Sequence, residues 1–290
     1  MSMETKGIPA RTYVLTGLAL VAFAANSVLC RLALGGAAID AASFSIIRLV
    51  SGAIMLLLIM AAIKKNRTSH PRGNWISAAM LFGYAVTFSF AYVSLSTGTG
   101  ALILFGAVQA TMILAALWSG ERPHMLEWMG LLLALFGLVY LVFPGLMAPS
   151  PAGSALMAIA GISWGFYSLR GRAAAYPLSE TTDNFVRSIP FAFVVSLLMF
   201  RNIHVSAEGV LLALVSGALT SGVGYVIWYA ALRGLTATRA ATVQLAVPIL
   251  AALGGVTFLS EDISLRLVLS AVMILGGVAL AVGSGERAVS

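Results

Sequence analysis

Long apolar segments separated by short polar turns dominate this sequence and restrict what it can fold into. The stretch from Gly98 to Gly145 contains two of them, on either side of one charged turn at residues 120–123. A helix needs about 20 residues to cross the hydrocarbon core of a bilayer, and these segments are long enough. A lipid-exposed backbone must satisfy its own hydrogen bonds, and the alternating pattern of a transmembrane barrel is missing. We therefore predict membrane-spanning helices.

The charge content supports the same class. Only 9% of the 290 residues are charged and 60% are apolar, whereas a soluble domain carries about 25% charged residues. We therefore expect a polytopic membrane protein whose main partner is the lipid bilayer. The net charge of +7 does not indicate nucleic acid, because the basic residues lie between apolar segments, where they orient a membrane protein. The single cysteine, Cys30, excludes a disulfide framework and a Cys-based metal site.

The apolar segments predict an all-α fold of ten transmembrane helices. The first segment is too long for the core of a signal peptide, which has about 7–15 residues, so we expect it to be retained. The Pro-, Gly- and Ser-containing stretch at 144–153 is the best candidate for a linker. The predicted spans are 12–34, 42–63, 74–95, 99–118, 125–143, 153–171, 182–200, 208–231, 237–258 and 264–283.

An internal repeat relates the two sides of that linker. When Gly17 is placed on Gly153, six of the fifteen positions that start with this pair match. Further matches keep a separation of 137 to 140 residues: Arg48/Arg187, Tyr92/Tyr229, Glu121/Glu261 and Gly137/Gly277. We expect two homologous five-helix repeats, residues 1–145 and 146–290. Because each contains an odd number of spans, the second is inverted relative to the first.

The basic residues give the predicted orientation. If the amino terminus is inside, twelve Lys and Arg residues lie on the inner side and three lie outside, namely Arg31, Arg201 and Arg266. Positive residues concentrate on the cytoplasmic side of membrane proteins. We therefore expect a multi-pass protein of the inner membrane with both termini in the cytoplasm.

Three local features carry a family resemblance: the Gly-Glu-Arg turn at 120–122, the Ser-Glu-Asp turn at 260–262, and Pro248. With them the chain resembles, over essentially its whole length, the EamA branch of the drug/metabolite transporter superfamily. The stretches GTGALILFGAVQ and GISWGFYSLRG are similar to bacterial amino acid exporters, particularly exporters of aromatic amino acids. The resemblance implies two inverted five-helix halves around a central cavity and outward transport of small metabolites. Val108 stands where the second half has Pro248, so a kink there is expected in one half only.

Ionisable residues are scarce inside the predicted spans. All acidic residues and histidines fall in loops, tails or first turns, so no carboxylate or imidazole is placed to relay protons through the membrane. Arg48 and Arg187 lie within spans, one to two turns from a helix end. Each either attracts a substrate carboxylate, or extends to the membrane interface or to carbonyl groups of a neighbouring helix.

Uncharged polar and aromatic residues inside the spans supply the candidate substrate site. An amide in hydrocarbon must face protein or a wet cavity, so each candidate amide either lines a site or joins helices by hydrogen bonds. The candidate aromatic side chains lie three or four residues apart, on one helical stripe each, and either line a site or fill the bundle. The candidates are Asn26, Tyr84, Phe88, Gln109, Trp164, Tyr167, Tyr225, Trp228 and Gln244. The candidate hinges are Gly98, Gly100, Gly106 and Pro248.

Together these features favour a secondary transporter that exports amino acids, including aromatic ones, or related small metabolites by alternating access. The sequence contains no nucleophile motif, P-loop or dinucleotide fingerprint, so we predict neither an enzyme nor a cofactor. We expect Glu121 and its counterpart Glu261 to cap the following span. The alternatives are a proton-coupled multidrug extruder and a lipid-modifying membrane enzyme. A monomer would suffice for transport.

Overall fold

The computed structural model describes residues 10–63, 73–118, 125–143, 148–172, 174–235 and 243–287. In these ranges the chain forms helices joined by turns, plus one isolated antiparallel bridge between Ile39 and Val205. The elements of the first half are α1 (Ala10–Gly35), α2 (Ala41–Ala62), α3 (Trp75–Tyr92), α4 (Thr97–Trp118) and α5 (Met125–Val142). Those of the second are α6 (Pro151–Arg172), α7 (Pro177–Leu198), η1 (Phe200–Asn202), α8 (Ala207–Val215), η2 (Ser216–Val223), α9 (Gly224–Leu232), α11 (Ala246–Leu259) and α12 (Leu265–Arg287).

Several of these helices are long and apolar enough to cross a bilayer, which makes this a multi-pass membrane protein. Six described helices meet that criterion: α1, α2, α3, α4, α6 and the continuous run α8–η2–α9. Shorter apolar stretches lie in α5, α11 and α12. Helix α7 carries Glu180, Asp183 and Arg187 within its first three turns. The count of ten spans stays a prediction.

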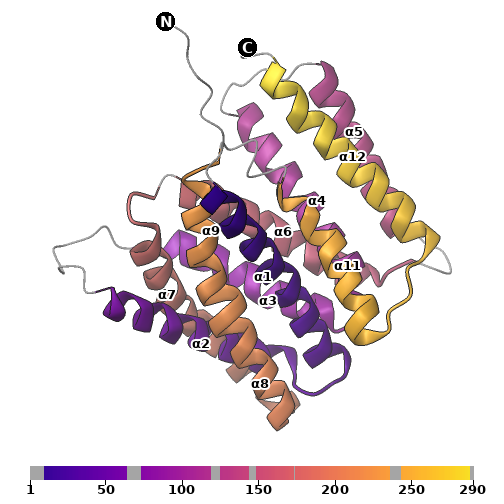
Figure 1. Ribbon diagram of the computed structural model, residues 1–290. Helices are drawn as coiled ribbons and strands as arrows, with labels where there is room; N and C mark the ends of the chain where they lie inside the picture. The colour runs from indigo at the N-terminus through magenta and orange to yellow at the C-terminus, as the bar shows by residue number, and fades with distance from the viewer. Residues whose placement is uncertain are drawn as a thin grey trace, which may run out of the picture.

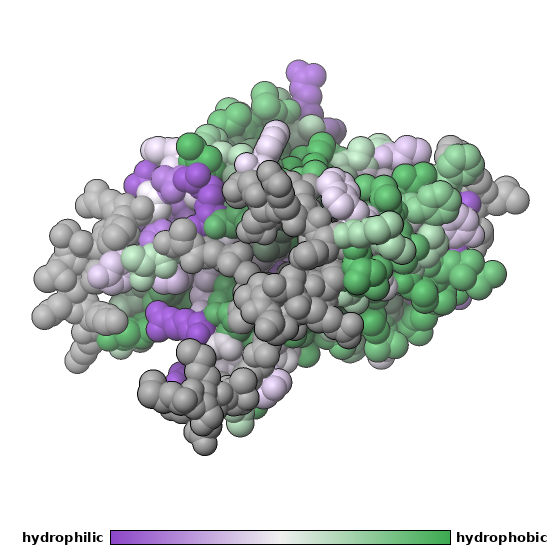
Figure 2. Space-filling model, turned by 90° about the horizontal axis from the view of Figure 1, so that it is seen from above, coloured by the Kyte–Doolittle hydropathy of each residue, from purple (hydrophilic) through white to green (hydrophobic). Residues whose placement is uncertain are grey.

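The helices form one bundle with a hydrophobic flank. Helices α5 and α12 pack side by side at one edge, next to α4 (Figure 1). Large apolar side chains such as Phe136 and Val272 are exposed on this pair. Seen along the bundle, hydrophobic residues cover this side, while hydrophilic residues gather on the side where α7 lies (Figure 2). An exposed apolar flank of this kind suits contact with lipid.

Two ends of the bundle can be distinguished. Helix α1 begins and α12 ends at the same end, which we call the near end (Figure 1). At the opposite far end, Asp40 caps α2 by accepting hydrogen bonds from the backbone N–H groups of Ala42 and Ser43 at 3.0 and 2.9 Å. Its second oxygen accepts the N–H of His204 at 3.1 Å. One carboxylate thus joins the α1–α2 turn to the segment before α8.

The run α8–η2–α9 changes its winding in the middle of the bundle. Residues Ser216–Val223 form a π-helix, an uncommon arrangement that is found frequently at functional sites. Here η2 meets α2 at very short range, because a Cβ atom on Gly217 would collide with the Ser51 hydroxyl and the Arg48 carbonyl oxygen. Glycine is therefore required at this contact.

The candidate hinge residues lie in different surroundings. A Cβ atom on Gly98 would be 2.9 Å from the Cβ of Ala252 on α11, and one on Gly100 would meet the Tyr92 ring at 2.5 Å. At Gly106 the nearest atom would be 3.6 Å away. Pro248 lies in the first turn of α11, just after a break in the helix at Leu245. Proline explains the break, because it has no N–H to donate to the carbonyl group four residues earlier.

Candidate functional site

Nine aromatic side chains meet in the middle of the bundle. Trp164 of α6 is at their centre, with its ring 4.9 Å from that of Tyr84, 5.0 Å from Tyr225 and 5.6 Å from Tyr167. Edge-to-face contacts connect the rings further, as for Phe23 and Trp228 at 5.6 Å. All nine are buried. This aromatic cluster consists of Phe23, Tyr84, Phe88, Tyr92, Trp164, Tyr167, Phe185, Tyr225 and Trp228.

The structure brings together all six aromatic residues that the sequence analysis selected. It adds Phe23 from α1, Tyr92 from α3 and Phe185 from α7, which were not predicted from the sequence. Phe23 lies three residues before Asn26 and therefore shares its stripe on α1, a spacing that could have identified it. Phe185 has no such neighbour among the candidates, and the packing of α7 against α2, α3 and α9 places it here.

Arg48 lies against this cluster and is almost completely buried, with 1% of its surface exposed. Its Nε donates a hydrogen bond to the Ser221 hydroxyl of η2 at 3.2 Å, and its Nη2 donates to the Tyr84 hydroxyl at 3.1 Å. The guanidinium carbon is 5.2 Å from the centre of the Tyr84 ring and 5.1 Å from that of Phe88. Nη1 is buried without a hydrogen-bond partner. For Arg48 the suggested extension to the membrane interface is wrong, because neighbouring helices enclose the side chain.

Asn26 joins the same network from α1. Its Nδ2 is 3.5 Å from the Tyr84 hydroxyl, and its Oδ1 accepts hydrogen bonds from Ser216 at 2.7 Å and Thr220 at 3.1 Å. The π-helix η2 supplies both of these hydroxyls and also Ser221 for Arg48. A polar network from α1, α2, α3 and η2 is therefore buried beside the aromatic cluster. From the sequence, Arg48 was one of two arginines that could attract a substrate carboxylate, but it was not among the nine selected residues; the serines and threonine of η2 were not predicted.

The other two candidate amides are buried on a neighbouring pair of helices. Gln109 belongs to α4 and Gln244 to the helical turn just before α11. Helices α4 and α11 pack against each other. None of the rings in the aromatic cluster comes from α4 or α11, so Gln109 and Gln244 lie on helices that do not contribute to the cluster.

Two cavities open at the near end of the bundle. The larger, of about 290 Å³, is lined partly by polar groups, including Asn74, Arg170 and Glu180, and reaches Tyr167 of the aromatic cluster. Arg170 donates hydrogen bonds to Ser77 at 2.9 Å and to Asn74 at 3.2 Å. The smaller cavity, of about 160 Å³, is mostly apolar. Both include Tyr229, which lies near the end of α9. We call these two the near-end cavities, and the larger one extends from that end of the bundle to the edge of the cluster.

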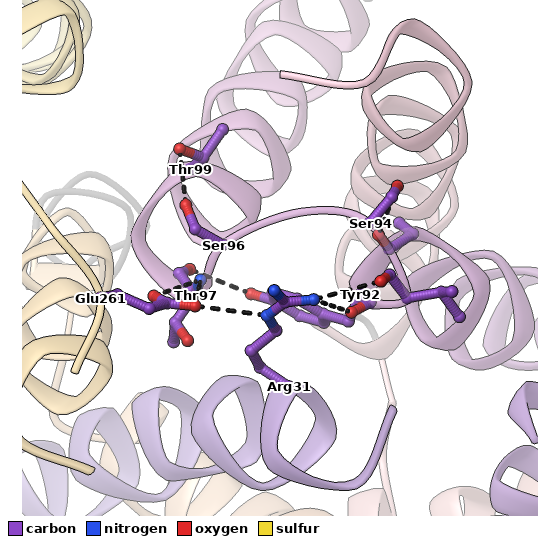
Figure 3. Close-up of polar contacts among 9 residues, drawn as sticks. Arg31, Tyr92, Ser94, Ser96, Thr97, Thr99 and Glu261 are labelled. Atoms are coloured by element: carbon purple, nitrogen blue, oxygen red, sulfur yellow. Dashed lines mark hydrogen bonds and ion pairs between the residues drawn. The ribbon is translucent and has the colours of Figure 1, made fainter. Parts of the chain in front are cut away.

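At the far end an ion pair joins the first and last parts of the chain (Figure 3). Arg31 of α1 reaches Glu261, with its Nε 3.3 Å from Oε1, and its Nη1 donates to the carbonyl oxygens of Tyr92 and Val93 at 3.0 and 3.1 Å. Both Glu261 oxygens accept the N–H of Thr97. We call this arrangement the Arg31–Glu261 clamp.

The clamp differs from what the sequence predicts for Glu261. Glu261 caps α4, whose first residue is Thr97, and not the following helix α12, so the expected cap on the next span is wrong for this glutamate. Its repeat counterpart Glu121 lies outside the described residues. Arg187, the other arginine predicted within a span, pairs with Asp183 at 4.0 Å and stacks on Trp75 while a quarter of its side chain stays exposed.

Comparison with known proteins gives a consistent result. The model of the EamA-like transporter family matches twice, at residues 11–143 and 151–283. An uncharacterized protein of Pseudomonas aeruginosa is 48% identical over 93% of this chain and 94% of its own length. A probable amino-acid metabolite efflux pump of Escherichia coli is 27% identical over 68% of this chain and 74% of its own length. A crystal structure with 18% identity shares the fold, with a TM-score of 0.64 over 93% of this chain and 99% of the other.

Proposed function

Because the chain belongs to the EamA-like transporter family of the drug/metabolite transporter superfamily, we propose that it is a secondary transporter that exports amino acids, including aromatic ones, or related small metabolites across the inner membrane. The observation that carries this proposal is the buried polar network of Arg48 and Asn26 against the aromatic cluster. A site with aromatic walls and a few convergent polar groups suits a small solute that has an apolar body and a polar end.

The proposed substrate site contains the nine residues selected from the sequence. Six belong to the aromatic cluster, and Asn26 contacts it through Tyr84. We place Gln109 and Gln244 on the transport path as part of the α4–α11 pair, which moves relative to the cluster. Gly98, Gly100, Gly106 and Pro248 act as hinges in this movement, and the break at Leu245 supports such a role for Pro248.

The proposed topology has ten transmembrane helices in two inverted repeats, residues 1–145 and 146–290. Two separate matches to the same family model, one on each side of the linker, support a duplicated unit. In this topology the near end and both termini face the cytoplasm. Alternating access then results from rearrangement of the two halves around the site. The near-end cavities and the far-end clamp fit a state that is closed toward the outside.

Flux measurements in proteoliposomes test the proposal. We expect saturable uptake or release of a subset of labelled amino acids, with the fastest flux for aromatic ones, and no flux in vesicles without the protein. The amino-acid metabolite efflux pump among the relatives supports this choice of compounds. If no amino acid shows saturable flux, with or without a pH gradient, the proposal is wrong. Flux that requires a pH gradient would favour the proton-coupled alternative.

A further inference from the structure

Arg48 carries a full positive charge in the middle of the bundle and has no negative partner among the described residues. Arginine stays protonated in proteins. Within the described ranges, the ion pairs are Arg31–Glu261 and Arg187–Asp183, and neither includes Arg48. The acceptors around it are the neutral hydroxyls of Ser221 and Tyr84, and Nη1 has none. Buried charges in proteins are normally paired, because the desolvation of an isolated charge is very unfavourable.

A purely structural role explains this arrangement poorly. An uncharged side chain could connect α2 to Ser221 and Tyr84 without the desolvation of a cation. The guanidinium can also donate further hydrogen bonds, since Nη1, one of its two terminal nitrogens, makes none with the described residues. Arginine is suited to carboxylates because its planar N–H groups match the two oxygens.

We propose that Arg48 binds the carboxylate of a small monocarboxylate whose aromatic body packs into the aromatic cluster. This inference rests on the proposed function and identifies the chemical class of its substrate. The guanidinium carbon lies over the Tyr84 and Phe88 rings, and Tyr84 contacts Trp164 at 4.9 Å. A carboxylate on Nη1 would therefore place the attached aromatic body next to these rings.

The amino group of the substrate is not required for this recognition. No acidic side chain in the described part of the chain pairs with the network, so an ammonium group meets no negative partner. The Oδ1 of Asn26, the network's amide oxygen, already accepts hydrogen bonds from Ser216 and Thr220. A carboxylic acid that lacks the amino group is therefore a substrate as good as the amino acid.

The substrate reaches Arg48 from the near end. The larger cavity extends to Tyr167, whose ring is 5.6 Å from that of Trp164. Trp164 in turn contacts Tyr84, which holds Arg48. Since Nη1 is buried in this conformation, the aromatic side chains between the cavity and Arg48 must separate for the substrate to bind.

Three matched compounds test the proposal on the purified full-length protein: 3-phenylpropionate, its neutral amide 3-phenylpropionamide, and phenylalanine. We expect 3-phenylpropionate and phenylalanine to bind with affinities within a few-fold of each other by calorimetry. The amide should bind about 10- to 100-fold more weakly, as expected for loss of a hydrogen bond to a charged group. Equal binding of acid and amide overturns the carboxylate assignment. Much tighter binding of phenylalanine than of 3-phenylpropionate overturns the claim about the amino group.

Three variants assign the effect to Arg48. Arg48→Gln should lower the affinity for 3-phenylpropionate to that measured for the amide and leave the affinity for the amide unchanged. Arg48→Lys should recover part of the affinity for 3-phenylpropionate. Arg187→Gln, which removes one arginine charge from a partly exposed position on α7, should have no effect. Thermal unfolding of each variant shows whether it is folded. If folded Arg48→Gln binds 3-phenylpropionate as wild type does, or if chloride displaces the carboxylate at equal concentration, the proposal is wrong. Saturable amino acid flux in that same protein would leave the proposed function standing.

Discussion

Arg31 and Arg48 lie on consecutive helices, and the protein surrounds their charges in opposite ways. Arg31 is paired with Glu261 and also donates to the carbonyl oxygens of Tyr92 and Val93, while 23% of its side chain stays exposed. Arg48 is more deeply buried, yet its partners are two hydroxyls and two aromatic rings. Of these two arginines, Arg48 is the more deeply buried, and among the described residues it has no carboxylate partner.

This difference separates a structural cation from one that is available to a ligand. The acceptors around Arg31 come from α3, the α3–α4 turn and the loop after α11, so the clamp fixes several segments at the far end (Figure 3). Arg48 has an unused donor beside an aromatic cluster that adjoins the near-end cavity. Four substitutions can break or sharpen this contrast.

The largest effect is expected from Gly217→Ala beside Arg48. The added Cβ would collide with the Arg48 carbonyl oxygen, which is backbone and cannot move without displacing α2. We expect a loss of about 3 kcal/mol in stability, at the upper end for overpacking, and loss of 3-phenylpropionate binding. Gly17→Ala is the matched control, because no atom lies within 4 Å of its added Cβ. Equal unfolding temperatures for the two variants would contradict the close contact between η2 and α2.

Glu261→Gln should open the far end without weakening the Arg48 site. It removes the charge that holds Arg31 and leaves a neutral amide oxygen as the acceptor for the Thr97 N–H that begins α4. Cys30, the chain's single cysteine, is buried next to Arg31 and reports on this opening. We expect its modification by a small thiol reagent to accelerate about tenfold, which corresponds to about 1.4 kcal/mol.

Asp262→Asn provides the control for that experiment. It makes the same chemical change one residue later, at an exposed position, and should leave the reactivity of Cys30 unchanged. An unaltered rate in Glu261→Gln would show that the clamp does not limit access from the far end.

Tyr84→Phe tests whether a ligand can replace a missing acceptor. The change keeps the ring and removes the hydroxyl that accepts from Arg48 and Asn26, which should cost about 1–2 kcal/mol in the unliganded protein. A carboxylate can then satisfy both terminal nitrogens of Arg48, so 3-phenylpropionate should raise the unfolding temperature more than in wild type. Tyr92→Phe removes a hydroxyl on the clamp side and should leave that shift unchanged. A smaller shift in Tyr84→Phe would indicate that the hydroxyl itself holds the ligand.

The smallest effect is expected at the third arginine. Arg187 and Asp183 are 4.0 Å apart and both are partly exposed, so their pair should contribute less than about 1 kcal/mol. Asp183→Asn should therefore change the unfolding temperature only slightly, and high salt should not change it further. A large decrease in the unfolding temperature would show that the Arg187–Asp183 ion pair stabilises the fold as the Arg31–Glu261 clamp does.

Much of the fold could be predicted because lipid leaves few alternatives. Helix positions follow from the lengths of the apolar segments, and the family follows from turns such as 260–262 and from Pro248. The aromatic cluster was partly predictable as well, since Tyr84 with Phe88 and Trp164 with Tyr167 share helical stripes.

The polar part of the site could not be predicted in the same way. Arg48 lies close enough to a helix end that the sequence allows it to reach the membrane interface, and only the packing of η2 and α3 around it excludes this. The π-helix has no signature in the residues Ser216–Val223. The partner of Glu261 was equally hidden, because it lies 230 residues earlier in the chain.

That separation has a consequence for how the protein is made. Arg31 is synthesised 230 residues before Glu261, so it cannot form this ion pair while the spans between them are being made. The contacts of Glu261 with Arg31 and with the Thr97 N–H at the start of α4 can form only after the segment that follows α11 has been synthesised. A chain that ends before residue 261 therefore lacks both the ion pair to Arg31 and the carboxylate that caps α4.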